Sequence, residues 1–166
     1  MRNRVLAAAC VSGLLLTACG TPGTAEGVDG AADAADAFVS AMQNADGDAA
    51  CGLLPSEARE LLAEENPALV ELHDPTVSDV EESCTAVFSE TLPEVLSEDE
   101  QEVIMSIEVT DNVELDEDGD SADVELDYLS LSGAQENDSL GLDWDGERWL
   151  ISDTSFMMDV LASTYY

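Results

Sequence analysis

The sequence predicts an α+β domain whose helices come first and whose strands follow. Apolar residues recur at helical spacing in the first half of the chain, whereas from Val103 onward apolar and polar positions alternate. An Asp-Gly turn between two apolar runs near the end adds a hairpin signal. Helices followed by a meander of strands are typical of α+β folds. We therefore expect N-terminal helices packed on an antiparallel sheet of about four strands.

Three helices are predicted before residue 66. The stretch "AADAADAFVSAMQNA" has an apolar face formed by Ala31, Ala35, Phe38, Val39, Met42 and Ala45. A short second helix starts in "ADGDAACGLL", where Asp48 is a candidate N-cap. The third begins at Pro55–Ser56 and ends at Asn66–Pro67. Its apolar side is formed by Ala58, Leu61 and Leu62.

A fourth helix is predicted after the pattern Ser78-Asp79-Val80-Glu81, which matches a capping box. The apolar stripe behind it consists of Val80, Cys84, Val87 and Phe88. Pro93 and the stretch "SEDEQ" then predict a break or a short turn of helix.

The first predicted strand is long and runs from Val103 to Leu115. Its odd positions are apolar except at Asp111, where we expect a bend. In the second strand, "ADVELDYLSLSG", Val124 and Leu126 face one way and Leu129 and Leu131 the other. That change of phase predicts a bulge near Tyr128.

The last two predicted strands form a hairpin. Leu140, Leu142 and Trp144 alternate along the third strand, and "ERWLISD" forms the fourth after the turn "DGE". Trp144 and Trp149 then face each other across the hairpin. Core packing is the default role of such a pair, and lining the mouth of a ligand pocket is the alternative.

The N-terminus predicts export. Arg2 and Arg4 precede an apolar run of about twelve residues, shorter than the roughly 20 that a membrane-spanning helix needs. The run closes on "LTAC", which resembles a bacterial lipobox. The resemblance implies a signal peptide over residues 1–18 and a diacylglyceryl anchor on Cys19 at the outer face of the membrane. An ordinary secretory peptide with an incidental cysteine is the alternative.

Residues 19–30 are expected to be the lipidated cysteine and a flexible tether, because "GTPGTAEGVDG" consists of small residues without an apolar pattern. Residues 31–166 then suit a single domain. Within it, Cys51 and Cys84 predict a disulfide, since exported proteins meet an oxidising environment. Closing this loop stabilises the fold by about 4 kcal/mol. A two-cysteine metal site lacks companions, since His73 is the only histidine.

The charge of the mature chain is extreme. Without Arg2 and Arg4, two cationic side chains, Arg59 and Arg148, stand against 38 acidic ones, a net charge of −36. This charge excludes nucleic acid as a partner and leaves membrane attachment to the lipid. It resembles adaptation to high salt, which screens repulsion. The alternative, an acidic disordered chain, conflicts with 45% apolar residues.

A family resemblance supports the fold prediction. The tethered lipobox, the phrase "AADAFVSAMQNADGDAACGLL" and the strand-rich half ending in "WDGERWLISD" resemble small actinobacterial lipoproteins of the nuclear transport factor two-like, cystatin-like fold. The resemblance covers residues 31–153. It implies a strongly curved sheet that forms a cone with the helices, and a pocket between helix and sheet. Proteins of this fold include both enzymes and binding modules, so the resemblance does not fix a function.

The stretch "ELDEDGDSADVELD" raises the question of calcium. Asp116, Asp118 and Asp120 have the spacing of the first ligands of an EF-hand loop, and Asp127 has that of the twelfth. However, the sixth position is Ser121 rather than glycine, and both flanks have strand periodicity. We therefore expect a hairpin turn at "EDGDS", with weak cation binding at most and no cofactor.

No catalytic set can be assembled from the sequence. His73, beside Asp74, is a conceivable general base, but Asp74–Pro75 predicts a solvated loop, and neither Ser56 nor Ser155 has a base partner. Phe156, Met157 and Met158 are core residues or a soft binding patch.

Three functions therefore stay open. The first is a non-catalytic lipoprotein that binds a small ligand or a cell-envelope partner. The second is an isomerase or dehydratase that uses His73 as acid and base, and the third is a cation-binding surface protein.

Overall fold

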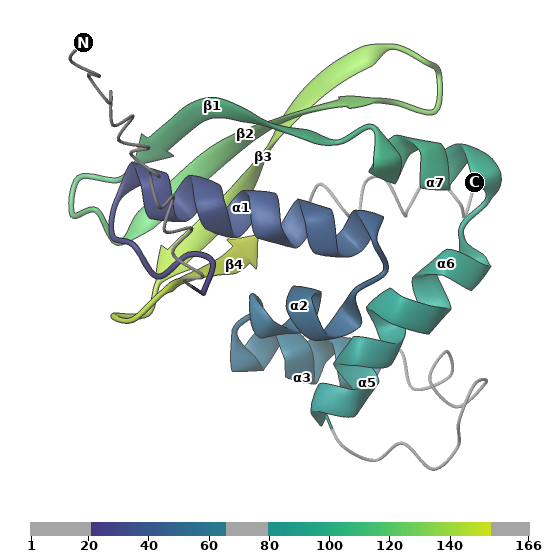
Figure 1. Cartoon of the computed structure of the whole chain (residues 1–166), viewed down its shortest axis with the longest axis horizontal. Helices are drawn as coiled ribbons and strands as arrows, with labels where there is room; N and C mark the ends of the chain where they lie inside the picture. The colour runs from purple at the N-terminus through teal and green to yellow at the C-terminus, as the bar shows by residue number, and fades with distance from the viewer. Residues whose placement is uncertain (1–20, 66–79, 154–166) are drawn as a thin grey trace, which may run out of the picture.

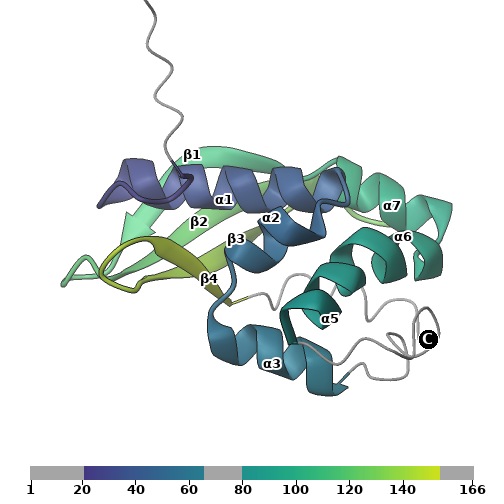
Figure 2. The same cartoon turned by 60° about the horizontal axis from the view of Figure 1, so that its bottom comes forward.

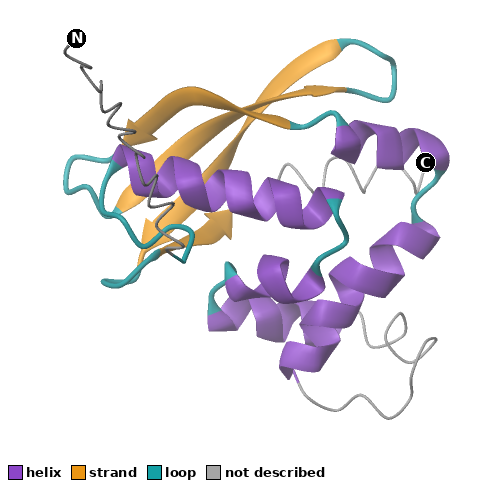
Figure 3. Cartoon of the chain, in the orientation of Figure 1, coloured by secondary structure: helices purple, strands orange, loops and turns teal. Residues whose placement is uncertain are grey.

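The computed structural model describes residues 21–65 and 80–153 of the chain, and within them helices precede a four-stranded sheet (Figures 1 and 3). The helical elements are α1 (Val28–Gln43), α2 (Gly47–Gly52), α3 (Ser56–Glu65), α5 (Val80–Ala86), η1 (Val87–Thr91), α6 (Leu92–Val95) and α7 (Glu98–Met105). The strands are β1 (Glu108–Leu115), β2 (Ser121–Leu129), β3 (Gln135–Trp144) and β4 (Trp149–Asp153).

The sheet is an antiparallel meander in the order β1-β2-β3-β4. The predicted α+β class and the predicted number of strands are therefore confirmed. Figure 2 shows α1 lying along one face of the sheet, while the other helices gather beyond its edge. The sheet is not closed, because β1 and β4 stay at opposite edges.

The core lies between α1 and the inner face of the sheet. Small residues let the helix approach the strands closely, and the helix face is formed by Ala31, Ala34, Ala35, Phe38 and Val39, all buried. The sheet contributes Val124 and Leu126 from β2, Leu140 and Leu142 from β3, and Trp149 and Ile151 from β4. The predicted apolar face of the first helix thus packs against the sheet, except that Ala45 lies beyond the end of α1 and has φ of +51°.

The segment that precedes α1 packs against the sheet instead of forming a free tether. The backbone N–H of Trp149 donates to the Gly23 carbonyl at 2.9 Å, and its indole Nε1–H donates to the Ala25 carbonyl at 3.1 Å. Gly23 and Gly30 are buried, and α1 already begins at Val28. The prediction that residues 19–30 form a tether is therefore wrong for its described part, because a buried indole needs a hydrogen-bond acceptor and this segment provides one.

The predicted disulfide between Cys51 and Cys84 is present. It joins α2 to α5, with the two Cα atoms 6.0 Å apart and both residues buried. The ring of Phe88 meets that of Phe38 nearby in an edge-to-face contact, with centroids 6.1 Å apart. The disulfide thus connects α5 to α2, which follows α1 directly in the chain.

The stretch from Val103 to Met105 is helical, so the prediction of a strand that begins at Val103 is wrong for its N-terminal part. Helix α7 covers these residues, and β1 begins only at Glu108. A capping box starts α7: the Ser97 hydroxyl accepts from the Glu100 N–H at 3.3 Å, and the Glu100 carboxylate accepts from the Ser97 N–H at 2.7 Å. This local start signal prevails over the period-two pattern, since Val103 and Ile107 are also one helical turn apart and are both buried.

Strand details differ in part from the prediction. Between Val109 and Val113 the register with β2 shifts, which matches the expected bend near Asp111. The pairing of β2 with β3 continues without a shift past Tyr128, so the bulge expected there is absent from that pairing. Strand β2 ends at Leu129, and both Leu129 and Leu131 are exposed.

Two details of the predicted helices also change. The N-cap of α2 is Asp46, which accepts from the Ala49 N–H at 3.1 Å, whereas Asp48 accepts from the Thr85 hydroxyl. Leu61 is 54% exposed, while Ala58 and Leu62 pack against the core as expected. A capping side chain must precede the first helical turn, and Asp48 lies inside it.

The outer face of the sheet carries uncompensated negative charge. Glu108 lies opposite Asp127, and Glu114 lies opposite Asp123. Like charges that face each other across strands destabilise a sheet. On the helix side, partial burial, and then the charges of Asp33 and Asp111, raise the pKa of Asp36. A raised pKa in the folded state means a penalty at neutral pH, which disappears as the pH falls below the pKa of the unfolded chain.

Replacing Gly30 by Ala tests the packing of residues 23–30. A Cβ at Gly30 would collide with the Ala25 carbonyl and lie 3.1 Å from the Trp149 ring. We expect Gly30→Ala to lower the free energy of unfolding by about 2 kcal/mol or more, measured by denaturant titration in molar salt. The control is Gly52→Ala, since nothing lies within 4 Å of that Cβ and alanine favours the helix by up to about 1 kcal/mol. Equal stability of the two variants would contradict this packing.

Candidate functional site

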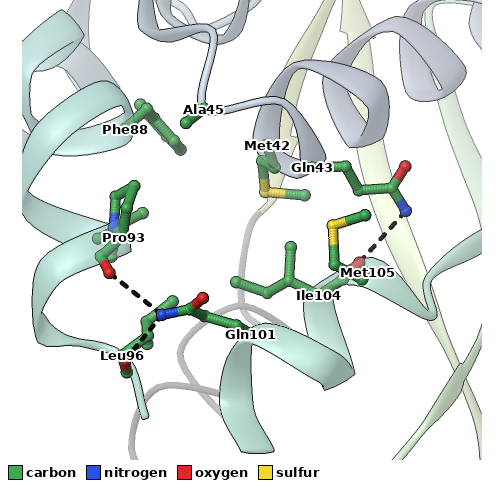
Figure 4. A pocket seen from close by; sticks show the side chains of 10 residues that line it. Met42, Gln43, Ala45, Phe88, Pro93, Leu96, Gln101, Ile104 and Met105 are labelled. Carbon is green, nitrogen blue, oxygen red and sulfur yellow. Dashed lines mark hydrogen bonds between the residues drawn. The ribbon is translucent and has the colours of Figure 1, made fainter. Parts of the chain in front are cut away.

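A small pocket lies at the C-terminal end of α1, where α1, the η1–α6 segment and α7 meet (Figure 4). Its volume is about 140 Å³. The lining residues come from these three segments and are Met42, Gln43, Ala45, Phe88, Leu92, Pro93, Leu96, Gln101, Ile104 and Met105. Several of them, Pro93 and Met105 among others, are exposed, so the pocket reaches the surface.

One wall owes its shape to a wide turn before Pro93. The Leu92 N–H donates to the Val87 carbonyl, five residues earlier, so residues 87–91 form a π-helical turn. A proline ring crowds the carbonyl four residues before it and has no N–H to donate. The widened turn relieves this conflict, and it places Phe88 and Leu92 on the pocket wall. Such π turns are frequent at functional sites.

Gln101 fixes the corner between α6 and α7. Its side-chain Nε2 donates to the carbonyls of Pro93 and Leu96, each at 3.1 Å. These carbonyls belong to the end of α6, where helical hydrogen bonds run out. Both amide hydrogens are therefore used by the protein, and the amide oxygen lies on the other side of the side chain, as Figure 4 shows.

Gln43 fixes the opposite corner. Its Nε2 donates to the carbonyl of Ile107 at 2.9 Å and to that of Ile104 at 3.2 Å. The last residue of α1 thereby holds the junction between α7 and β1. Two glutamine amides thus tie the three walls together, which makes the pocket preformed.

The chemistry that the pocket offers is apolar. Its lining consists mainly of Met, Leu, Ile, Phe and Pro carbon atoms, and no titratable side chain is among the described residues that line it. Such a surface recognises an uncharged apolar group by burial and dispersion. Methionine adapts its shape readily, and the lining contains two methionines, Met42 and Met105.

The acidic stretch at residues 116–120 forms the predicted hairpin turn. One carboxylate oxygen of Asp116, Oδ1, accepts from the N–H groups of Gly119, Asp120 and Ser121 at 2.6, 2.9 and 3.2 Å. Gly119 has φ of +78°, a conformation that glycine adopts without strain. In residues 21–65 and 80–153, no group of three or more His, Cys, Asp or Glu side chains is arranged to hold a metal ion.

The two tryptophans face each other as predicted, at a distance of 5.6 Å between ring centroids. Trp149 is fully buried in the core, and Trp144 is half-buried beside it. Arg148, in the turn between them, lies 4.0 Å from Asp145. Hydrogen bonds from the N–H groups of Arg148 and Glu147 lower the pKa of Asp145. None of these five residues lines the pocket.

Several predicted residues lie outside the described parts of the chain. They are the signal peptide with Cys19, the capping pattern that starts at Ser78, His73, Ser155 and the apolar residues 156–158. Roles for Cys19 and His73 therefore stay predictions. Ser56 is described, and its hydroxyl donates to the carboxylate of Glu57 at 3.0 Å. Among the described helices, none is both long and apolar enough to cross a membrane.

Sequence reasoning did not find the pocket. Its walls come from three segments up to 63 positions apart, from Met42 to Met105. The available signals were Pro93 behind a helical stripe and the glutamines Gln43 and Gln101, and neither signal is specific. The family resemblance alone predicted a pocket, and it placed that pocket between helix and sheet. The pocket at the end of α1 has a different place, because its lining residues come from the helical part of the chain and none belongs to a strand.

Comparisons with known proteins add no relative. No family model matches the chain, no curated protein is similar to it, and no solved structure matches its fold. The resemblance to nuclear transport factor two-like lipoproteins therefore stays a prediction, although the helix-on-sheet fold is compatible with it.

Replacing Gln101 by Ala removes two hydrogen bonds between α6 and α7. We expect a loss of about 1–2 kcal/mol in unfolding free energy, measured by denaturant titration. The matched control is Gln135→Ala at an exposed position on β3, which we expect to change stability by less than about 0.5 kcal/mol. A Gln101 variant as stable as the control would show that this amide does not hold the corner.

Proposed function

We propose that this chain is a non-catalytic lipoprotein that is anchored to the outer face of the cell membrane through Cys19. Its single domain binds a small ligand or a cell-envelope partner through the pocket between α1, α6 and α7. The observation that carries the binding role is this preformed apolar pocket, held at two corners by Gln43 and Gln101.

The anchoring role rests on the "LTAC" motif behind a basic start and a short apolar run. Two acyl chains on one cysteine hold a protein stably at a bilayer. Because the Gly23 carbonyl already accepts a hydrogen bond from Trp149, only four residue steps separate Cys19 from the folded domain. They span at most roughly 14 Å, so the domain would stand close to the headgroups.

The place of the pocket favours access from the medium. Residues 21–27 pack beside the N-terminal part of α1, where Gly23 approaches Ala34. The pocket, by contrast, is lined by Met42 and Gln43 at the C-terminal end of the helix. The 16 residues of α1 span about 24 Å. A ligand or partner would thus meet the domain at the end away from its attachment. The net charge of the chain, −34, also repels anionic headgroups.

Replacing Cys19 by Ser tests the anchor. We expect Cys19→Ser to move the protein from the membrane fraction to the medium, and the native protein to carry the mass of a diacylated N-terminal cysteine. Cys10→Ser is the matched control, because Cys10 would leave with the signal peptide. If Cys19→Ser stays in the membrane fraction to the same extent as Cys10→Ser, the anchor is wrong.

Binding of toluene tests the pocket. Apolar cavities of about 150 Å³ hold benzene-sized molecules. With ¹³C-labelled methionine methyls, we expect toluene to shift the Met42 and Met105 signals with a Kd on the order of 1 mM. Ile104→Trp should abolish the shifts, because its ring would fill the pocket, into which Figure 4 shows Ile104 pointing.

The matched control for this variant is Val95→Trp, which adds the same ring at a position on α6 that is 51% exposed and does not line the pocket. It should bind toluene like the native protein. Absence of any toluene shift at Met42 and Met105 in the native protein would refute the pocket as a ligand site.

A further inference from the structure

We infer that the pocket receives one apolar side chain of a basic protein partner, in which a residue the size of leucine or phenylalanine is flanked by lysine or arginine. This inference rests on the proposed function and deepens it, because it chooses the protein partner over the small ligand.

The size of the pocket supports a single side chain. Sites for drug-sized molecules have volumes of roughly 300–1,000 Å³ and bury most of the ligand. The pocket has about 140 Å³, close to the size of a cavity that holds benzene. Protein interfaces use such pockets for their central anchor residues, which are apolar or aromatic and contribute most of the binding energy.

Exposed apolar residues next to the pocket support an extended contact. Met105 lines the pocket and is 61% exposed, and Leu129 is 43% exposed. The Leu129 N–H donates to the hydroxyl of Ser106 at 2.9 Å, so the end of β2 borders the end of α7. An exposed leucine at the end of the sheet therefore lies close to the end of α7 that lines the pocket. Exposed apolar residues near a pocket are typical of a protein-binding site.

The negative charge around the pocket favours a positively charged partner. Of the fourteen residues from Leu92 to Met105, five are acidic and none is basic. The two cations of the mature chain lie elsewhere, Arg59 on α3 and Arg148 in the β3–β4 turn. An acidic partner, a second copy of this chain with its charge of −34, or a nucleic acid would be repelled. Lysine or arginine beside the apolar anchor would be attracted and would speed association.

The walls of the pocket are held in place by side-chain hydrogen bonds. Because Gln43 and Gln101 donate their amide hydrogens to four backbone carbonyls, the pocket keeps its shape without an occupant. A preformed pocket lowers the entropy that binding must overcome. The amide oxygen of Gln101 offers an acceptor to the backbone N–H of a docked segment.

Three capped synthetic peptides test the inference on the whole mature chain: KKGLGKK, KKGAGKK and EEGLGEE. Affinities are measured by calorimetry, and the Met42 and Met105 methyl signals report where each peptide binds, at the lowest salt that keeps the chain folded. We expect KKGLGKK to bind about tenfold tighter than KKGAGKK, because leucine buries more apolar surface than alanine. EEGLGEE should bind more weakly than either. Ile104→Trp should remove the leucine preference, and Val95→Trp should retain it.

Equal affinities of the leucine and alanine peptides would mean attraction to the acidic surface alone and would overturn the inference. The inference would also be overturned if EEGLGEE bound more tightly than KKGLGKK, or if no peptide bound. Toluene separates this failure from a failure of the proposed function. If toluene binds and the peptides show no leucine preference, the pocket is a small-ligand site, and if neither binds, both proposals are wrong.

Discussion

Helix α1 is held against the sheet near both of its ends, and this double attachment positions the remaining elements. Near its start, the buried Trp149 of β4 bonds to the segment that leads into the helix, through the carbonyls of Gly23 and Ala25. At its end, Gln43 bonds to the junction between α7 and β1. The helix therefore fixes the sheet at one end and the pocket at the other. A buried amide or indole without its partner costs about 1–3 kcal/mol, which makes both attachments specific.

In a chain with so few cationic side chains, most carboxylates cannot form ion pairs, and several accept hydrogen bonds from the backbone instead. In the described residues, Asp46 caps α2 and Glu100 closes the capping box of α7. Asp116 and Asp145 accept backbone N–H groups in the β1–β2 and β3–β4 turns. Each hydrogen bond to a charged acceptor contributes more than a neutral one. Repulsion remains on the outer face of the sheet, and salt would reduce it by shortening the Debye length to about 3 Å at 1 M. The fold thus depends on the disulfide, the core and these local bonds.

The sequence predicted elements where one signal dominated and failed where two signals competed. Period-two alternation and the Asp-Gly turn predicted β3 and β4. The Cys51–Cys84 disulfide was predicted because an exported protein meets an oxidising environment. From Val103 to Met105, an alternating pattern coincided with a helical one, and the capping box at Ser97 decided. The packing of residues 23–30 was hidden because small residues look alike in a tether and in a tight contact. The pocket was hidden because it depends on tertiary packing of distant segments, and no local pattern reports that.

A crystal structure under xenon pressure would show whether the apolar pocket at the end of α1 is open. The mature chain with Cys19→Ser would be crystallised in molar salt, since xenon enters dry apolar cavities without needing a particular polar group. We expect xenon between Met42, Phe88 and Ile104, with little movement of the walls. A pocket closed by its own lining, or filled by another part of the same chain, would mean that neither a ligand nor a partner side chain can enter there.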